Sequence, residues 1–158
     1  MKRIIITITF AVITAVAAFA QSGESIYKKY SDCKGVDGVY ISPAMFQMIG
    51  SIPDLEIDDA DINLSGIIRS LRGLYIVEAK TPEIRKSLKK DVESFVNSKK
   101  YELMMEMKSD GERVYIYTVG DQTNVESFVM FSEEDDEVVF ISIDGTMPRK
   151  ELESMIMK

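Results

Sequence analysis

The sequence predicts an α+β domain in which helices pack on one face of a mixed, mainly antiparallel sheet of about six strands. Two observations support this fold class. Between residues 101 and 143, four segments with alternating apolar residues follow one another with only turn-forming residues between them, as in an antiparallel meander. Before residue 101, segments with apolar residues at helical spacing alternate with two short strand-like segments. The expected order is therefore β-α-α-β-α-β-β-β-β-α.

The first twenty residues have the pattern of a cleaved signal peptide. Two basic residues precede an uncharged apolar run that ends in Ala18-Phe19-Ala20, and the polar Gln21 follows. We therefore expect cleavage after Ala20, a single domain over residues 21–158, and a periplasmic, secreted or cell-surface location. Because the apolar run approaches the roughly 17 residues that can span a bilayer, a retained membrane anchor is the alternative.

The first structured elements are expected after residue 30. Residues 21–30 are expected to be poorly ordered, as exposed chain ends usually are. Residues 35–42 read as a short strand, because they contain a Val-Tyr-Ile run of high β-propensity. Ser42-Pro43 then predicts the start of a short helix, since serine favours the N-cap and proline the first helical position. Gly50 is expected to end this helix.

Two further helices are expected on either side of a buried strand over residues 74–79. The first ends near Arg72-Gly73 and has apolar residues at i, i+3, i+4 and i+7, namely Leu64, Ile67, Ile68 and Leu71. The second begins at Thr81-Pro82-Glu83, which supplies a cap residue, a first-turn proline and a first-turn acid. Its apolar stripe consists of Ile84, Leu88, Val92, Phe95 and Val96.

The meander is expected to occupy the remainder of the chain, with strands over residues 101–108, 113–119, 125–131 and 137–143. Asp110-Gly111 predicts a tight hairpin turn between the first two strands, because both positions tolerate positive φ. Thr146-Met147-Pro148 is expected to cap a last short helix whose inward residues are Leu152, Met155 and Ile156.

Two adjoining stretches carry a resemblance to a known family. They are "INLSGIIRSLRGLYIVEA" and, one residue later, "TPEIRKSLKKDVESFV", and the meander follows them. In a short chain with a signal peptide, this pattern resembles the uncharacterised exported-protein family named Domain of Unknown Function 4252, found in Gram-negative bacteria. The resemblance covers most of the chain after residue 20. It implies export and an α+β fold but no catalytic residue, because its signature consists of apolar and small residues.

The composition excludes several functions. The chain has no histidine, so Ser-His-Asp catalysis, Cys-His catalysis and histidine-based zinc or copper sites are impossible within it. Removal of residues 1–20 takes away two basic and no acidic residues, and the formal net charge falls from −7 to −9. Such a chain is not expected to bind nucleic acid or an anionic membrane surface. Cys33 is the only cysteine and cannot form an internal disulfide.

The segment "DLEIDDADINLSG", residues 54–66, is a weak candidate for a cation site. Asp59, Asp61 and Asn63 match positions 1, 3 and 5 of an EF-hand loop. However, Leu64 and Ser70 stand where that loop needs glycine and glutamate. We therefore interpret Asp61 as the N-cap of the following helix and expect neither a metal nor a cofactor.

Two other charged segments are interpreted as solvated surface. Residues 132–137, "SEEDDE", are expected to form a hairpin loop that could converge with the first acidic segment. The helix that begins at Thr81 has a lysine-rich outer face, for which binding to an anionic lipid or phosphate is the alternative.

The alternation of the meander predicts two apolar sheet faces. Leu103, Met105, Ile116, Val129, Ile141 and Ile143 are expected to face the helices. The opposite face then contains Met104, Tyr115, Tyr117, Phe128, Met130, Val138 and Phe140, although a face exposed to water should be mostly polar. An N-terminal segment, the final helix or a homodimer would cover this face, or it binds a partner.

The function expected from these features is that of an exported, non-enzymatic protein-binding or scaffolding module. Its partner would be an envelope protein or a second copy of the chain, bound through Tyr115, Tyr117, Phe128, Met130 and Phe140. The alternative is a hydrolase or lyase that uses an Asp/Glu pair, with or without a divalent ion, although no carboxylate pair has a recognisable spacing.

The signal peptide leads to a direct test. The intact mass of the protein recovered from the envelope or medium of the producing cells is expected to correspond to a chain that starts at Gln21, with or without cyclisation of this glutamine. A species that retains Met1 in purified membranes would contradict the cleavage.

Overall fold

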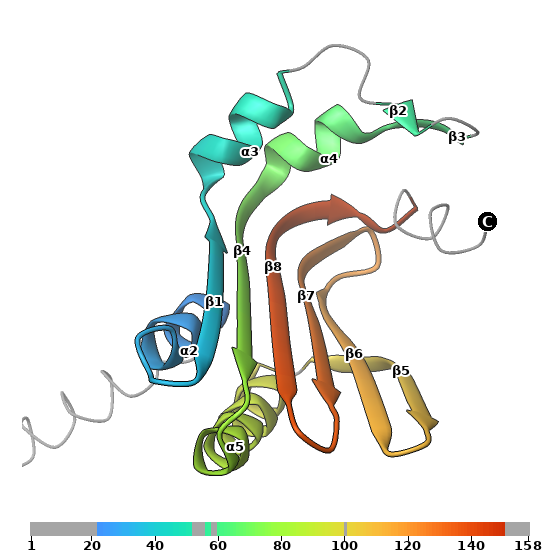
Figure 1. The fold of residues 1–158 in the computed structure, drawn as a ribbon. Coiled ribbons are helices and arrows are strands. Elements are labelled where there is room, and N and C mark those ends of the chain that lie inside the picture. The colour runs from blue at the N-terminus through green and yellow to red at the C-terminus, as the bar shows by residue number, and fades with distance from the viewer. Residues whose placement is uncertain (1–21, 52–55, 58–59, 100, 151–158) are drawn as a thin grey trace, which may run out of the picture.

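The computed structural model describes residues 22–51, 56–57, 60–99 and 101–150 of the chain. Six strands form one sheet in the order β1-β4-β8-β7-β6-β5, and every neighbouring pair is antiparallel (Figure 1). These strands are β1 (Val36–Ile41), β4 (Leu71–Ala79), β5 (Glu102–Ser109), β6 (Glu112–Gly120), β7 (Asn124–Glu133) and β8 (Val138–Pro148). The other elements are α2 (Gly23–Tyr30), α3 (Pro43–Ile49), α4 (Leu64–Ser70), α5 (Pro82–Ser98) and the short pair β2 (Glu56–Ile57) and β3 (Ala60–Asn63).

The predicted α+β class and the predicted element order are confirmed, with α2 and the β2–β3 pair as additions. The Asp110-Gly111 turn is also confirmed, because both residues have positive φ, 37° and 93°. Strand β8 runs past its predicted end, so that Thr146-Met147-Pro148 belong to the strand. Helical residues begin directly after it, at Arg149. The expected inward residues of the final helix, Leu152, Met155 and Ile156, lie outside the described residues.

The segment that was expected to be poorly ordered forms helix α2. Ser22 is its N-cap and shares a capping box with Ser25, which satisfies backbone donors at the start of the helix. Ile26 and Tyr30, four residues apart, are buried in the main core. At Gly23 the helix comes so close to the sheet that a Cβ would lie 2.3 Å from the Ser142 hydroxyl oxygen.

Polar contacts join α2 to α5. The Tyr30 hydroxyl donates a hydrogen bond of 2.7 Å to the Asp91 carboxylate and lies 2.9 Å from the Ser87 hydroxyl. The Lys29 ammonium forms an ion pair with the same carboxylate. Burial alone would raise the pKa of Asp91, but the hydrogen bonds from Lys29 and Tyr30 hold this pKa below its ordinary value.

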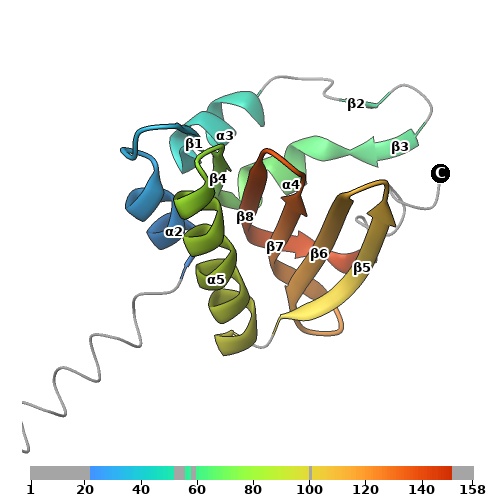
Figure 2. The ribbon, with the colours of Figure 1, turned by 60° about the horizontal axis from the view of Figure 1, so that its bottom comes forward.

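Helix α5 provides most of the helical side of the main core. Its apolar stripe was predicted correctly, and Leu88, Val92, Phe95 and Val96 are buried against the sheet. The Phe95 ring meets the ring of Phe140 on β8 edge to face, with centroids 6.3 Å apart. Helix α5 packs on β4 and β8, whereas β6 and β5 lie toward the opposite edge of the sheet (Figure 2).

Helices α3 and α4 pack on each other at one end of the sheet (Figure 1). The predicted start of α3 is confirmed, because Ser42 accepts a hydrogen bond from the Met45 amide and Pro43 occupies the first turn. Ile67 of α4 is buried in a second, smaller cluster with Val125 and Met147. Phe128, Ile143 and Leu71 border this cluster.

The Asp91 contacts lead to a prediction about pH. Because the pKa of Asp91 is lower in the folded chain, its contribution to stability is present above its unfolded value and is lost as the pH falls through the folded value. We expect Asp91→Asn to lower the free energy of unfolding by about 1 kcal/mol at pH 7. In urea titrations, the difference from the unsubstituted protein should shrink as the pH falls below about 4. A difference that stays constant down to pH 2 would contradict this role.

Candidate functional site, an uncovered face of the sheet

The register of the six strands assigns each side chain to one of two faces, because directly paired residues in antiparallel strands point to the same side. One face contacts α2 and α5 and is called here the covered face. Its central row, from β1 to β5, consists of Gly38, Val77, Phe140, Phe131, Tyr115 and Glu106. Val77, Phe131 and Phe140 from this row are buried in the main core with the helices.

The opposite side is called here the open face, and its central row is apolar across all six strands. From β1 to β5, this row consists of Val39, Ile76, Ile141, Met130, Ile116 and Met105. The row nearer α4 consists of Ile41, Leu74, Ile143, Phe128, Thr118 and Glu102. The third row consists of Asp37, Glu78, Val139, Ser132, Val114 and Met107. The acids of the open face therefore lie only at its corners and margin.

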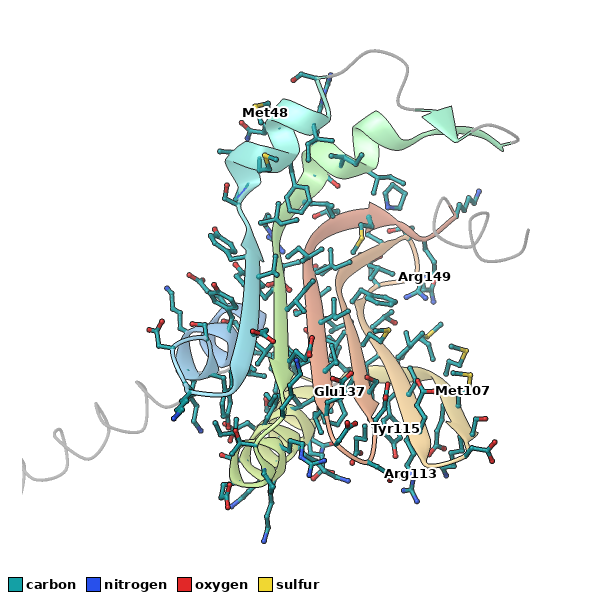
Figure 3. The ribbon with its side chains drawn as sticks, in the orientation of Figure 1. Met48, Met107, Arg113, Tyr115, Glu137 and Arg149 are labelled. Carbon is teal, nitrogen blue, oxygen red and sulfur yellow. The ribbon has the colours of Figure 1, made fainter. Side chains whose placement is uncertain are left out.

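The open face remains partly accessible to solvent. Every residue of its central row is half-buried or exposed, and Val39 and Met105 at the two edge strands are 48% and 47% exposed. Met107, which Figure 3 shows on the edge strand β5, is also 47% exposed. The second cluster borders Phe128 and Ile143 and so shields part of the row nearer α4. Isolated exposed apolar residues are ordinary, but a contiguous area of this kind marks a contact surface.

Strands β5 and β6 make the anomaly clear, because their two sides can be compared directly. On the covered face they carry Glu106, Lys108 and Arg113, polar residues suited to water. On the open face the same strands carry Met105, Met107 and Ile116. A strand with one solvated side should be polar on that side. Near the β5–β6 turn, the polarity of these two strands is therefore the reverse of what one copy of the chain requires. Farther from the turn, the covered side carries Leu103 and Tyr117 and the open face carries Glu102 and Thr118.

The predicted partner-binding residues divide between the two faces. Phe128 and Met130 lie on the open face, as predicted. Tyr115, Tyr117 and Phe140 lie on the covered face, so their assignment was wrong. Phe140 is 0% exposed, and Tyr115 and Tyr117 stack on each other and pack against the main core.

The other predicted face assignments change in the same way. Met105, Ile116, Ile141 and Ile143 lie on the open face and not against the helices, and Val138 is buried on the covered face. Val129 does face the helices, and Leu103 lies on the covered side but is 51% exposed. The three assignments on β7, for Phe128, Val129 and Met130, were thus correct and those on β6 and β8 were inverted. A bulge between Leu103 and Met105 interrupts the alternation of β5.

The structure describes the backbone of two of the three candidate cation ligands. Asp59 lies outside the described residues, and Asp61 and Asn63 belong to strand β3. Helix α4 begins at Leu64, so Asp61 is not its N-cap as expected. No group of three or more acids or cysteines in the described part of the chain is arranged to hold a metal ion.

The acidic loop and the basic face of α5 contact each other. Lys89 donates a hydrogen bond of 2.7 Å to Glu133, and the Arg85 guanidinium donates one of 2.6 Å to the Asp135 carbonyl oxygen. The loop also lies beside the β5–β6 turn, where Asp110 and Asp135 line one shallow groove. These contacts favour a structural role for both charged segments over anion or cation binding.

One pair of carboxyl groups does lie together, at a corner of the open face. Burial, followed by the neighbouring carboxyl of Glu78, raises the pKa of Glu137. Lys80 forms ion pairs with both Glu78 and Asp37, at 2.6 and 3.2 Å. Because this corner is exposed and Lys80 pairs with its acids, its geometry is that of a charged margin and not of an enclosed acid–base site.

A cavity of about 540 Å³ lies on the covered side, between the start of α2 and the end of α5. Within it, the Tyr101 hydroxyl donates to the Ser127 hydroxyl at 2.8 Å, and Ser127 donates to the Asp144 carboxylate at 2.7 Å. Burial raises the pKa of Tyr101 to about 12, so this phenol stays protonated at neutral pH. The centroids of the Tyr101 and Phe95 rings are 5.1 Å apart. This ring contact and the two hydrogen bonds together hold Tyr101, just before β5, against the sheet.

Comparisons with known proteins identify a family and no function. The family model described as "Domain of unknown function (DUF4252)" matches residues 30–155. No curated protein and no solved structure matches the chain. Among the described residues, none of the helices has the length and apolar character needed to cross a membrane.

The register leads to a paired prediction on adjacent residues of β8. Phe140→Ala should lower the free energy of unfolding by about 3–5 kcal/mol, because it removes a fully buried ring. Ile141→Ala should cost roughly 1–2 kcal/mol, because its side chain on the open face is only partly buried. Chemical denaturation at low protein concentration measures both values. A larger loss for Ile141→Ala would place the two faces the other way round, and equal losses would contradict the difference in burial between them.

Proposed function

The chain belongs to the DUF4252 family, a domain of unknown function, and we propose that it is an exported, non-enzymatic module that binds another polypeptide through the open face of its sheet. The observation that carries this proposal is the central row of that face, which is apolar from β1 to β5. Removal of such a row from water is the main source of free energy in protein association. Export rests on the signal-peptide pattern of residues 1–20.

The chemistry of the open face favours a polypeptide over other ligands. Its margin carries the acids Asp37, Glu78 and Glu102. Lys80 at this margin already pairs with the first two, so the margin is acidic overall and would repel the phosphates of nucleic acids and of anionic lipids. A small molecule would need an enclosed cavity, whereas this face is a broad surface. Another polypeptide can cover it as a second layer, which is how sheets of this kind ordinarily bury an apolar side.

The edges of the sheet are less suited to binding than its open face. The edge strand β5 is exposed along its length, but a bulge interrupts it and Glu102, Glu106 and Lys108 are spread along it. Bulges and charges on an edge strand discourage the addition of another strand. The proposed contact therefore uses side chains of the face more than backbone groups of the edge.

A photoreactive amino acid at single positions tests this function in the producing cells. At Met107, on the open face, ultraviolet light should yield a covalent adduct to a polypeptide of discrete mass. Leu103 is the matched control, because it lies on the same strand and is similarly exposed, at 51% against 47%, but belongs to the covered side. No polypeptide adduct at Met107, or equal adducts at both positions, would contradict the proposal.

A further inference from the structure

Resting on the proposed function, we propose that the polypeptide bound by the open face is a second copy of this chain. The two sheets pack face to face around a twofold axis that runs parallel to the strands between β7 and β8. This axis places β1 of one copy opposite β5 of the other, β4 opposite β6, and β8 opposite β7. The contact is isologous, so that each copy uses the same surface.

The sizes of the side chains favour this axis. In the central row it pairs Val39 with Met105, Ile76 with Ile116, and Ile141 with Met130 of the second copy. In two of these three pairs a long, flexible methionine meets a shorter β-branched residue, and in the third two isoleucines meet, so the gap between the sheets stays nearly uniform. A twofold axis across the strands would instead stack Met105 on Met105 and Val39 on Val39, which crowds one edge and leaves a void at the other.

The charges of the open face are compatible with the same arrangement. Asp37 and Glu78 lie opposite Met107 and Val114 of the second copy, and Glu102 lies opposite Ile41. Within the three rows no two acids face each other, and the three acids of these rows lie at the perimeter, where water can reach them. Two copies of an acidic chain can therefore associate without burying like charges at the contact.

The area of the open face predicts how strong this contact is. Six strands at the usual spacing make it roughly 29 Å wide, and its three rows make it roughly 20 Å long, which gives about 600 Å² per copy. Without the row that the second cluster partly shields, about 400 Å² remains. The pair then buries about 800–1,200 Å², the range of weak specific interfaces. We therefore expect a reversible dimer that forms as concentration rises.

Analytical ultracentrifugation of the purified chain without residues 1–20, over a range of protein concentrations, tests the inference. Two variants on one strand are compared with the unsubstituted chain. Met105→Lys should weaken self-association at least roughly tenfold, because it places a charge in the apolar contact. Leu103→Lys is the control and should leave self-association unchanged, because the bulge turns this residue to the covered side. Both side chains are about half-exposed, so neither change removes a core residue.

A monomer at all concentrations, or equal effects of the two variants, would overturn the dimer. Neither result would contradict the proposed function if the photoreactive residue at Met107 yields an adduct of a mass other than two copies of the chain. The axis has its own test in a Cys33→Ser background. A short bismaleimide should join Val39→Cys to Met105→Cys in a mixture, and should not join Met105→Cys chains alone. The reverse result would overturn the axis.

Discussion

Successive side chains of a β-strand point to opposite faces of its sheet, and the strands of this chain are apolar in both directions. Helices α2 and α5 together cover one face, and they leave the other with a continuous apolar row from Val39 to Met105. A sheet with one solvated side normally resolves this constraint by alternation of polar and apolar residues. Here the side away from α2 and α5 is apolar as well, and the proposed association follows from that mismatch.

Elements with strong local signals could be predicted from the sequence. Helix α5, the Asp110-Gly111 turn and the four-strand meander each depend on residues within a few positions of one another, and all three are present. Helix α2 was missed because its stability depends on long-range contacts. Ile26 is buried against the sheet, and Tyr30 bonds to Asp91, sixty-one residues away.

An apolar second face of the sheet could be predicted from the sequence, but the residues that form it could not. A one-residue change of register moves every side chain of a strand to the other face, and only a polar side identifies the correct register. In β8, Phe140 and Ile141 are both apolar, so the pattern does not distinguish a register that buries one from a register that buries the other. On β6, polarity is misleading. Arg113 shares a face with Tyr115 and Tyr117, and its charge suggests a solvated side, although the two tyrosines on this face pack against the main core.

Methionine oxidation tests whether polypeptide covers the open face in the associated protein. The chain without residues 1–20 would be exposed briefly to hydroxyl radicals, at low and at high protein concentration. Mass spectrometry of its peptides would then measure the oxidation of each methionine. Met45 and Met48 on α3 are exposed outside the face, and Met147 is buried, so they serve as internal references. Met105 and Met107 should become protected from oxidation, relative to Met48, as the protein concentration rises. If the oxidation of Met105 and Met107 relative to Met48 stays the same at every concentration, association does not cover the open face.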